Sequence, residues 1–86
     1  MNTIEIEKYL EDNNCNEVKS WDEAAFLTLT AWVDAEDVER AISRIEKRAA
    51  AFVKNHPEAS VEPVSTEVAY NGERIVTITI ENTANL

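Results

Sequence analysis

The sequence predicts an α+β fold, in which one long helix packs on one face of a three-stranded mixed sheet. Two patterns lead to this prediction. Between Ala35 and Lys54, apolar residues recur every three or four positions, as on one side of an amphipathic helix. Between Val61 and Glu81, two runs that contain β-branched residues flank a single Asn-Gly pair, as in a β-hairpin. A chain of 86 residues supports one small core, so we expect residues 1–86 to form a single domain.

The N-terminal segment predicts a short helix before the first strand. Asn2 and Glu5 have the spacing of a capping box, the pattern that opens many helices. The helix would bury three side chains: Ile6, Tyr9 and Leu10. Ile4 and Ile6 also alternate with polar residues, so a strand is the alternative for this segment.

The segment Ala24–Val33 predicts the first strand. Its side chains alternate between two sets, as on the two faces of a strand: Leu27, Leu29, Ala31 and Val33 in one, Phe26, Thr28, Thr30 and Trp32 in the other. The preceding residues Ser20–Glu23 resemble a capping box, so a helix is the alternative here. The β-forming composition of the segment favours the strand.

The helix predicted over Ala35–Lys54 has signals at both ends. Asp34 is a good N-cap, acidic residues crowd the first turns, and basic residues follow toward the C-terminal end, so the charges complement the helix dipole. Pro57 ends the helix, because proline disfavours the helical conformation at the residue before it. We expect Ile45 and Phe52 to lie in the core beneath the sheet.

The hairpin needs a three-residue loop, Tyr70–Gly72, to place its apolar residues on one face. With that loop, and with Gly72 at positive φ in a bulge, Thr66 pairs with Val76 and Val64 with Ile78. A two-residue Asn-Gly loop would place Val64 on the face opposite to Val76. Pro63 cannot donate a backbone hydrogen bond, so its strand is expected at the edge of the sheet.

The predicted order is therefore an N-terminal helix followed by β-α-β-β. The β-α-β crossover leaves its two strands parallel, and the last strand can insert between them, antiparallel to both. This arrangement resembles half of a ferredoxin-like fold. The long helix would cover one face, and the other would carry Phe26, Trp32 and Ile75. Either the N-terminal helix or another molecule must cover those three side chains.

Chemical motifs are absent from the sequence. The single His56 and Cys15 cannot make a zinc site, and Gly72 is the only glycine, so no glycine-rich phosphate loop exists. Asp34, Glu36 and Asp37 are close together, but helix capping explains them without a metal. We therefore expect no enzyme activity, no cofactor and no metal. The lone cysteine and the lack of a secretory signal or an apolar span predict a cytoplasmic protein that does not enter a membrane.

The net charge of -9 lies entirely in residues 1–39, which predicts a partner with a basic surface. Direct binding to nucleic acid is disfavoured, because such affinity depends on neutralising phosphates. The candidate partner-binding residues are Glu5, Glu7, Glu11, Asp12, Glu17, Asp22, Glu23, Phe26 and Trp32. The function predicted is that of an inhibitor or adaptor, in its sharpest form a nucleic-acid mimic. In size and charge the chain resembles anti-restriction and anti-CRISPR proteins of phages and mobile elements. A homo-oligomeric structural or regulatory domain, for example a homodimer, is the alternative.

Overall fold

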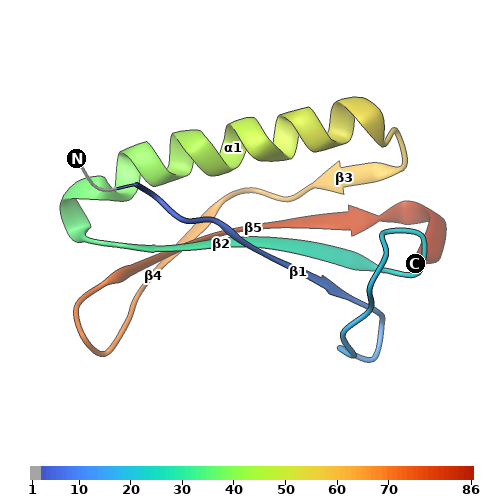
Figure 1. Ribbon diagram of the computed structural model, residues 1–86, viewed down its shortest axis with the longest axis horizontal. Helices are drawn as coiled ribbons and strands as arrows, with labels where there is room; N and C mark the ends of the chain where they lie inside the picture. The colour runs from blue at the N-terminus through green and yellow to red at the C-terminus, as the bar shows by residue number, and fades with distance from the viewer. Residues whose placement is uncertain (1–2) are drawn as a thin grey trace.

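The computed structural model describes residues 3–86 and has the predicted α+β class, with one long helix on one face of a sheet (Figure 1). The helix is α1 (Val38–Asn55), and a 3₁₀ turn, η1 (Ala35–Asp37), leads into it. The five strands are β1 (Glu7–Glu11), β2 (Phe26–Val33), β3 (Ala59–Val61), β4 (Ser65–Val68) and β5 (Arg74–Asn82). A second 3₁₀ turn, η2 (Thr83–Asn85), follows β5.

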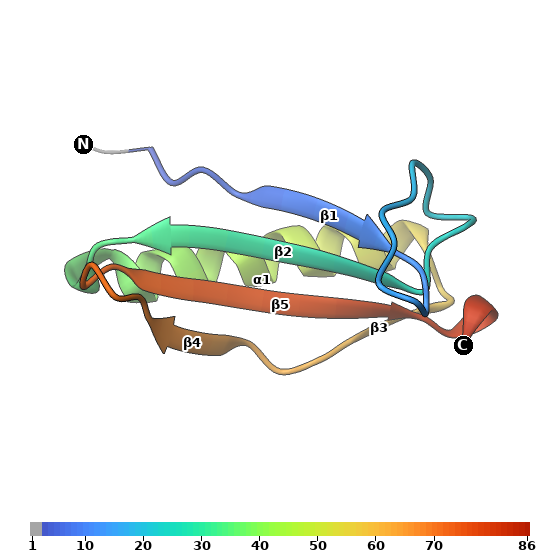
Figure 2. The same cartoon turned by 90° about the horizontal axis from the view of Figure 1, so that it is seen from below.

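The sheet has five strands instead of the predicted three, because β1 is added at one edge and the first strand of the hairpin is divided into β3 and β4. All its pairings are antiparallel. Its order is β1-β2-β5-β3, and β4 pairs with the other end of β5 (Figure 2). The predicted insertion is confirmed, since β5 lies between β2 and the strands β3 and β4. The strand β5 therefore separates β2 from β3, the two strands that α1 connects.

The predicted N-terminal helix is wrong. Residues Glu7–Glu11 form β1, which pairs antiparallel with β2 from Glu7 opposite Thr30 to Glu11 opposite Phe26. The segment follows its period-two alternation and forms a strand, because the backbone N–H and C=O groups of a strand there can form hydrogen bonds with the free edge of β2. Asn2, the expected cap, lies outside the described residues.

The strand predicted on the N-terminal side of the hairpin is two strands, β3 and β4, with registers that differ by one residue. Val61 is opposite Ile80, whereas Ser65 is opposite Thr77. The connection contains Pro63, which has no backbone N–H to donate, and it absorbs the extra residue as a bulge does. Both strands pair with β5 alone among the described strands, so the predicted edge position of this segment is confirmed.

The turn between β4 and β5 is the predicted three-residue loop. Thr66 is opposite Val76, and Gly72 has φ of 88°. The Gly72 N–H donates to the carbonyl of Ala69 at 2.9 Å, and the Ala69 N–H donates to the carbonyl of Glu73 at 2.8 Å. The register and the glycine conformation are therefore both confirmed.

Gly72→Ala should lower the free energy of unfolding by about 1 kcal/mol, because the backbone keeps a left-handed conformation that a Cβ disfavours. No atom lies within 4 Å of the added Cβ, so the cost is conformational rather than steric. Urea denaturation of the variant measures it. Gly72→Asn should recover part of the loss, since asparagine tolerates this conformation better. Equal stability of wild type and Gly72→Ala would contradict the assignment.

The core lies between α1 and the helix-side residues of β2 and β5, as the apolar stripe predicted. Ile45, Ala41 and Ala49 of α1 are buried. They face five buried side chains of the sheet: Leu27, Leu29, Val76, Ile78 and Ile80. Phe52 is only half-buried, at the end of the core, where its ring stacks on His56.

In the described part of the chain, no helix is long and apolar enough to cross a membrane.

The predicted side-chain cap of the helix is not formed. Neither Asp34, before η1, nor Asp37, before α1, makes a side-chain cap hydrogen bond. Instead the backbone carbonyl of Asp34 accepts from the Asp37 N–H at 2.9 Å, which tightens the entry into a 3₁₀ turn. At the other end the helix stops at Asn55, two residues before Pro57, as predicted.

Candidate functional site

The face of the sheet opposite α1 is the candidate site, and we call it the open face. Among residues 3–86, no helix covers this side of the strands (Figure 1). The cross-strand register and the Glu62–Glu81 contact assign these side chains to it: Glu7, Tyr9, Glu11, Phe26, Thr28, Thr30, Trp32, Ser60, Glu62, Ser65, Glu67, Ile75, Thr77, Thr79 and Glu81. The predicted covering by an N-terminal helix is therefore absent from the described structure.

Large apolar side chains lie on both halves of the open face. Trp32 of β2 is opposite Ile75 of β5, and its side chain is 49% exposed. Near the other end, Phe26 lies between Glu11 of β1 and Glu81 of β5. Tyr9 is 45% exposed, and not buried as the predicted helix required. An exposed tryptophan and tyrosine on one sheet face are typical of a binding surface.

The polar side chains of the open face are of two kinds, threonines on the two central strands and glutamates at other positions. Four threonines of β2 and β5 face one another across the two central strands: Thr28, Thr30, Thr77 and Thr79. Five carboxylates come from the other positions: Glu7, Glu11, Glu62, Glu67 and Glu81. None of the residues assigned to this face is Lys or Arg.

The strand pairing gathers acidic residues from both halves of the chain on one face of the sheet. The helix α1 carries five basic and two acidic residues, so its net charge is +3 within a protein of net charge -9. Glu62, Glu67 and Glu81 belong to the half of the sequence that is neutral overall, yet they join Glu7 and Glu11 on the open face. The antiparallel pairing of the sheet brings the two groups together.

Two of these carboxylates share a hydrogen bond. The contact with Glu62 raises the pKa of Glu81 above its usual range, first through the hydrogen bond and also through charge repulsion. On β1, the Tyr9 hydroxyl donates to the Glu7 carboxylate, which raises the pKa of that phenol. Both interactions show that negative charge is crowded on this face.

Glu62→Gln should reduce the loss of stability that Glu81 causes as the pH rises. A carboxyl group whose pKa is raised on folding stabilises the folded state below its unfolded pKa, and that contribution disappears as the pH rises through the raised value. Unfolding free energies of wild type and variant should therefore differ increasingly from mildly acidic to neutral pH, with the variant more stable. The control is Glu67→Gln, with the same charge change on the same face. Parallel pH profiles for wild type and Glu62→Gln would contradict the pairing.

The structure brings together four of the nine predicted partner-binding residues: Glu7, Glu11, Phe26 and Trp32. Glu5 precedes β1 and is exposed, and Glu17 forms an isolated bridge with Glu11 in the loop after β1. Asp22 and Glu23 are exposed in the turn before β2. The charge of Glu17 contributes to the raised pKa of Tyr9, so Glu17 lies beside the β1 edge of the open face, whereas Glu5, Asp22 and Glu23 are not assigned to that face.

Asp12 has a local structural role. Its Oδ1 atom accepts hydrogen bonds from the backbone N–H groups of Asn14, at 2.9 Å, and Asn16, at 3.0 Å. These bonds lower the pKa of the Asp12 carboxyl, with the bond to Asn16 the largest cause. They close a tight turn in which Cys15 has φ of 61°. Asp12 is thus a turn-forming residue, as the Asx geometry implies.

Sequence reasoning missed Tyr9, Glu62, Glu67 and Glu81 as members of the site. The predicted helix buries Tyr9, and the net charge of residues 1–39 directs attention away from the three glutamates, which lie in the neutral half of the sequence. The signal that identifies them is the alternation along the strands, since Glu67 is opposite Ile75 and Glu81 is opposite Phe26. Residues opposite one another in a sheet point to the same face.

Elsewhere the described residues offer little chemistry. Carboxylate oxygens of Asp34, Glu36 and Asp37 lie within 4.8 Å of one another at the start of α1, but Asp37 also pairs with Arg40 at 3.3 Å. Exposed acids of this kind are common without a metal. Nδ1 of His56 lies 2.9 Å from the carbonyl of Phe52, so this imidazole interacts with the end of the helix. Cys15 is an exposed free thiol.

Comparisons with protein-family models, curated proteins and solved structures found no match to this chain.

Proposed function

We propose that this chain is a non-enzymatic acidic module whose open face binds a basic surface of another protein. The observation that carries the proposal is the composition of that face, on which five carboxylates accompany Tyr9, Phe26, Trp32 and Ile75 without one basic side chain. Protein interfaces commonly combine apolar anchors, tryptophan and tyrosine above all, with a polar rim.

Electrostatics supports a basic partner over a neutral one. Carboxylates gathered on one face repel one another, and beside its hydrogen bond with Glu62 this repulsion contributes to the raised pKa of Glu81. Lysine and arginine side chains of a partner would relieve that repulsion and would accelerate association at low salt. The threonine hydroxyls at the centre of the face supply donors and acceptors for polar contacts.

The sharpest version of the proposal is an inhibitor or adaptor that mimics nucleic acid. Its carboxylates would take the place of phosphates on a DNA- or RNA-handling protein, as in anti-defence proteins of phages and mobile elements. What supports this version is the surface charge, together with a size suited to occupying one groove of a partner. The proposal places the protein in the cytoplasm, which suits the exposed free thiol of Cys15.

Capture from cell lysate with matched variants tests the proposal. Glu7→Gln/Glu11→Gln removes two charges from the open face, and Asp22→Asn/Glu23→Gln removes two from the adjacent loop. The immobilised wild-type chain should retain a specific protein at 0.1 M salt and release most of it at 0.5 M, because salt screens the charges. The first variant should lose that protein and the second should keep it. Equal retention by both variants would contradict the proposal.

Competition then tests the nucleic-acid mimic. A captured partner that handles DNA or RNA should be displaced from the open face when a duplex or single strand of its own substrate is added. A partner that binds the chain and its nucleic acid together would leave the binding module intact but would contradict mimicry.

The alternative is a homo-oligomer, favoured by the opposite charges of α1 and the open face. Face-to-face contact of two copies would oppose their carboxylates, so only a contact of the open face with a neighbouring α1 is electrostatically favourable. We expect light scattering to give the monomer mass. A larger mass that falls to the monomer at high salt would support the alternative.

A further inference from the structure

A groove lies mainly on the helix side of the sheet, between β1 and α1. The helix packs mainly over β5, β2 and β3, so the helix-side residues of the edge strand β1 stay partly uncovered. One hollow there has a volume of about 370 Å³ and a second of about 260 Å³. Lys8, Leu27 and Phe52 line both hollows, so the two adjoin. We call the pair of hollows the β1–α1 groove.

The walls of the β1–α1 groove are mostly apolar and are held in place. Leu10 and Leu27 are cross-strand partners on β1 and β2. Trp21 closes one end, where its ring meets Phe52 edge-on at 4.8 Å between centroids. The Trp21 indole N–H donates to Glu58 at 2.7 Å. An apolar wall fixed by these contacts can shield a hydrocarbon chain from water.

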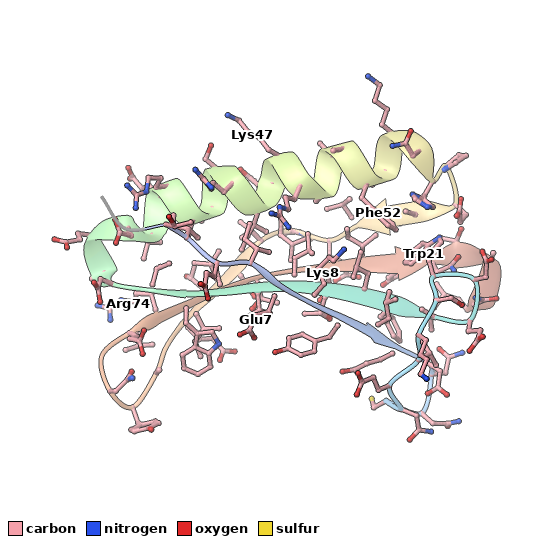
Figure 3. The ribbon with its side chains drawn as sticks, viewed as in Figure 1. Glu7, Lys8, Trp21, Lys47, Phe52 and Arg74 are labelled. Carbon is pink, nitrogen blue, oxygen red and sulfur yellow. The ribbon has the colours of Figure 1, made fainter. Side chains whose placement is uncertain are left out.

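The charged side chains of the groove are mainly basic. Lys8 lies on the helix side of β1, because it is opposite the buried Leu29 (Figure 3). Lys19 and Arg48 also line the groove, and Glu17 is the one acidic residue there. This local excess of positive charge is opposite in sign to the net charge of -9.

We propose that the β1–α1 groove binds an anionic amphiphile with a single alkyl chain and a carboxylate head, as in a fatty acid. The apolar walls would take the chain, and Lys8, Lys19 or Arg48 would pair with the carboxylate. The volume of the larger hollow lies within the usual range of small-molecule sites. The groove lies mainly on the helix side of the sheet and meets the open face only at the edge strand β1, where Tyr9 also lines the larger hollow.

Fluorescence of Trp21 tests the groove directly, in a Trp32→Phe variant where Trp21 is the only tryptophan. The probe is decanoate, kept below its critical micelle concentration, and its matched control is decyltrimethylammonium. Decanoate should change the Trp21 emission saturably, and the cationic amphiphile should bind more weakly or not at all. The net negative charge of the whole chain would instead favour the cationic amphiphile over decanoate. Equal or tighter binding of the cation, or a decanoate response that does not saturate, would overturn the proposal.

Charge variants locate the site. Lys8→Gln and Arg48→Gln should each weaken decanoate binding about two- to fivefold, as expected for a partly exposed ion pair. Lys47→Gln is the control, because Lys47 is exposed and points from the same helix away from the sheet (Figure 3). Circular dichroism confirms that each variant is folded. Unchanged affinity in Lys8→Gln and Arg48→Gln, or an equal loss in Lys47→Gln, would overturn the assignment.

Discussion

Ile45→Ala should lower the free energy of unfolding by about 2–5 kcal/mol. Ile45 is fully buried and is among the largest of the completely enclosed side chains. It lies at the centre of the contact between α1 and the sheet, and a cavity there removes contacts with both layers. A domain of this size has about 5 kcal/mol of stability or little more, so the variant should be largely unfolded at modest urea concentrations. Urea denaturation followed by circular dichroism measures the loss.

Ile45→Val and Ser43→Ala complete the experiment. The valine variant should cost about 0.5–1.5 kcal/mol, which keeps the loss measurable if the alanine variant does not fold. Ser43 is exposed on the same helix, so its replacement should change stability by about 0.5 kcal/mol or less. Near-native stability of Ile45→Ala would mean that α1 does not pack on the sheet through this face.

Trp32→Ala should weaken binding of the natural partner about 30-fold, which corresponds to about 2 kcal/mol. Trp32 is the large aromatic residue at one end of the open face, and Ile75 opposite it fixes its position in the sheet. Since half of the Trp32 side chain is exposed, the substitution should cost the free protein only about 1 kcal/mol of stability or less. Titration calorimetry with the captured partner measures the affinity.

Tyr70→Ala is the matched control for Trp32→Ala. Tyr70 is a fully exposed aromatic residue in the loop between β4 and β5, outside the residues of the open face. Its truncation should leave the affinity within about twofold of wild type, as expected for a residue outside an interface. If the two variants bind equally well, Trp32 is not an anchor of the interface.

Local patterns predicted the helix and the hairpin well, because the residues that determine each of these elements lie within one short stretch of sequence. The stripe that includes Ile45 has the helical period, and the requirement for a common apolar face chose the loop ending at Gly72. The split between β3 and β4 at Pro63 was missed. A one-residue shift of register is set by pairing with β5 and leaves no local signal.

The N-terminal strand shows where local reasoning fails. The spacing of Asn2 and Glu5 satisfies a helix cap, and the alternation from Ile4 to Leu10 satisfies a strand. The choice between them depends on β2, whose free edge offers hydrogen bonds that only a strand can use. Pairing with β2 therefore outweighs the local helix signal of this segment.

The candidate site was predicted in part for the same reason. Alternation placed Phe26 and Trp32 on the face away from the helix, and β1 adds Glu7 and Glu11 to it. Counting charge along the chain separated these acids from Glu81, whereas the sheet places Glu81 directly opposite Phe26. Charge that is dispersed in sequence became a patch only through strand pairing.

The most direct test of the open face compares the two tryptophan indole N–H signals by NMR during titration with the captured partner. Trp32 lies on the open face, and Trp21 lies in the groove on the other side, where its N–H donates to Glu58. The two signals therefore report on opposite sides of one sheet in the same sample. We expect the Trp32 signal to shift or broaden in proportion to bound partner while the Trp21 signal stays in place. Movement of the Trp21 signal with an unchanged Trp32 signal would contradict this expectation.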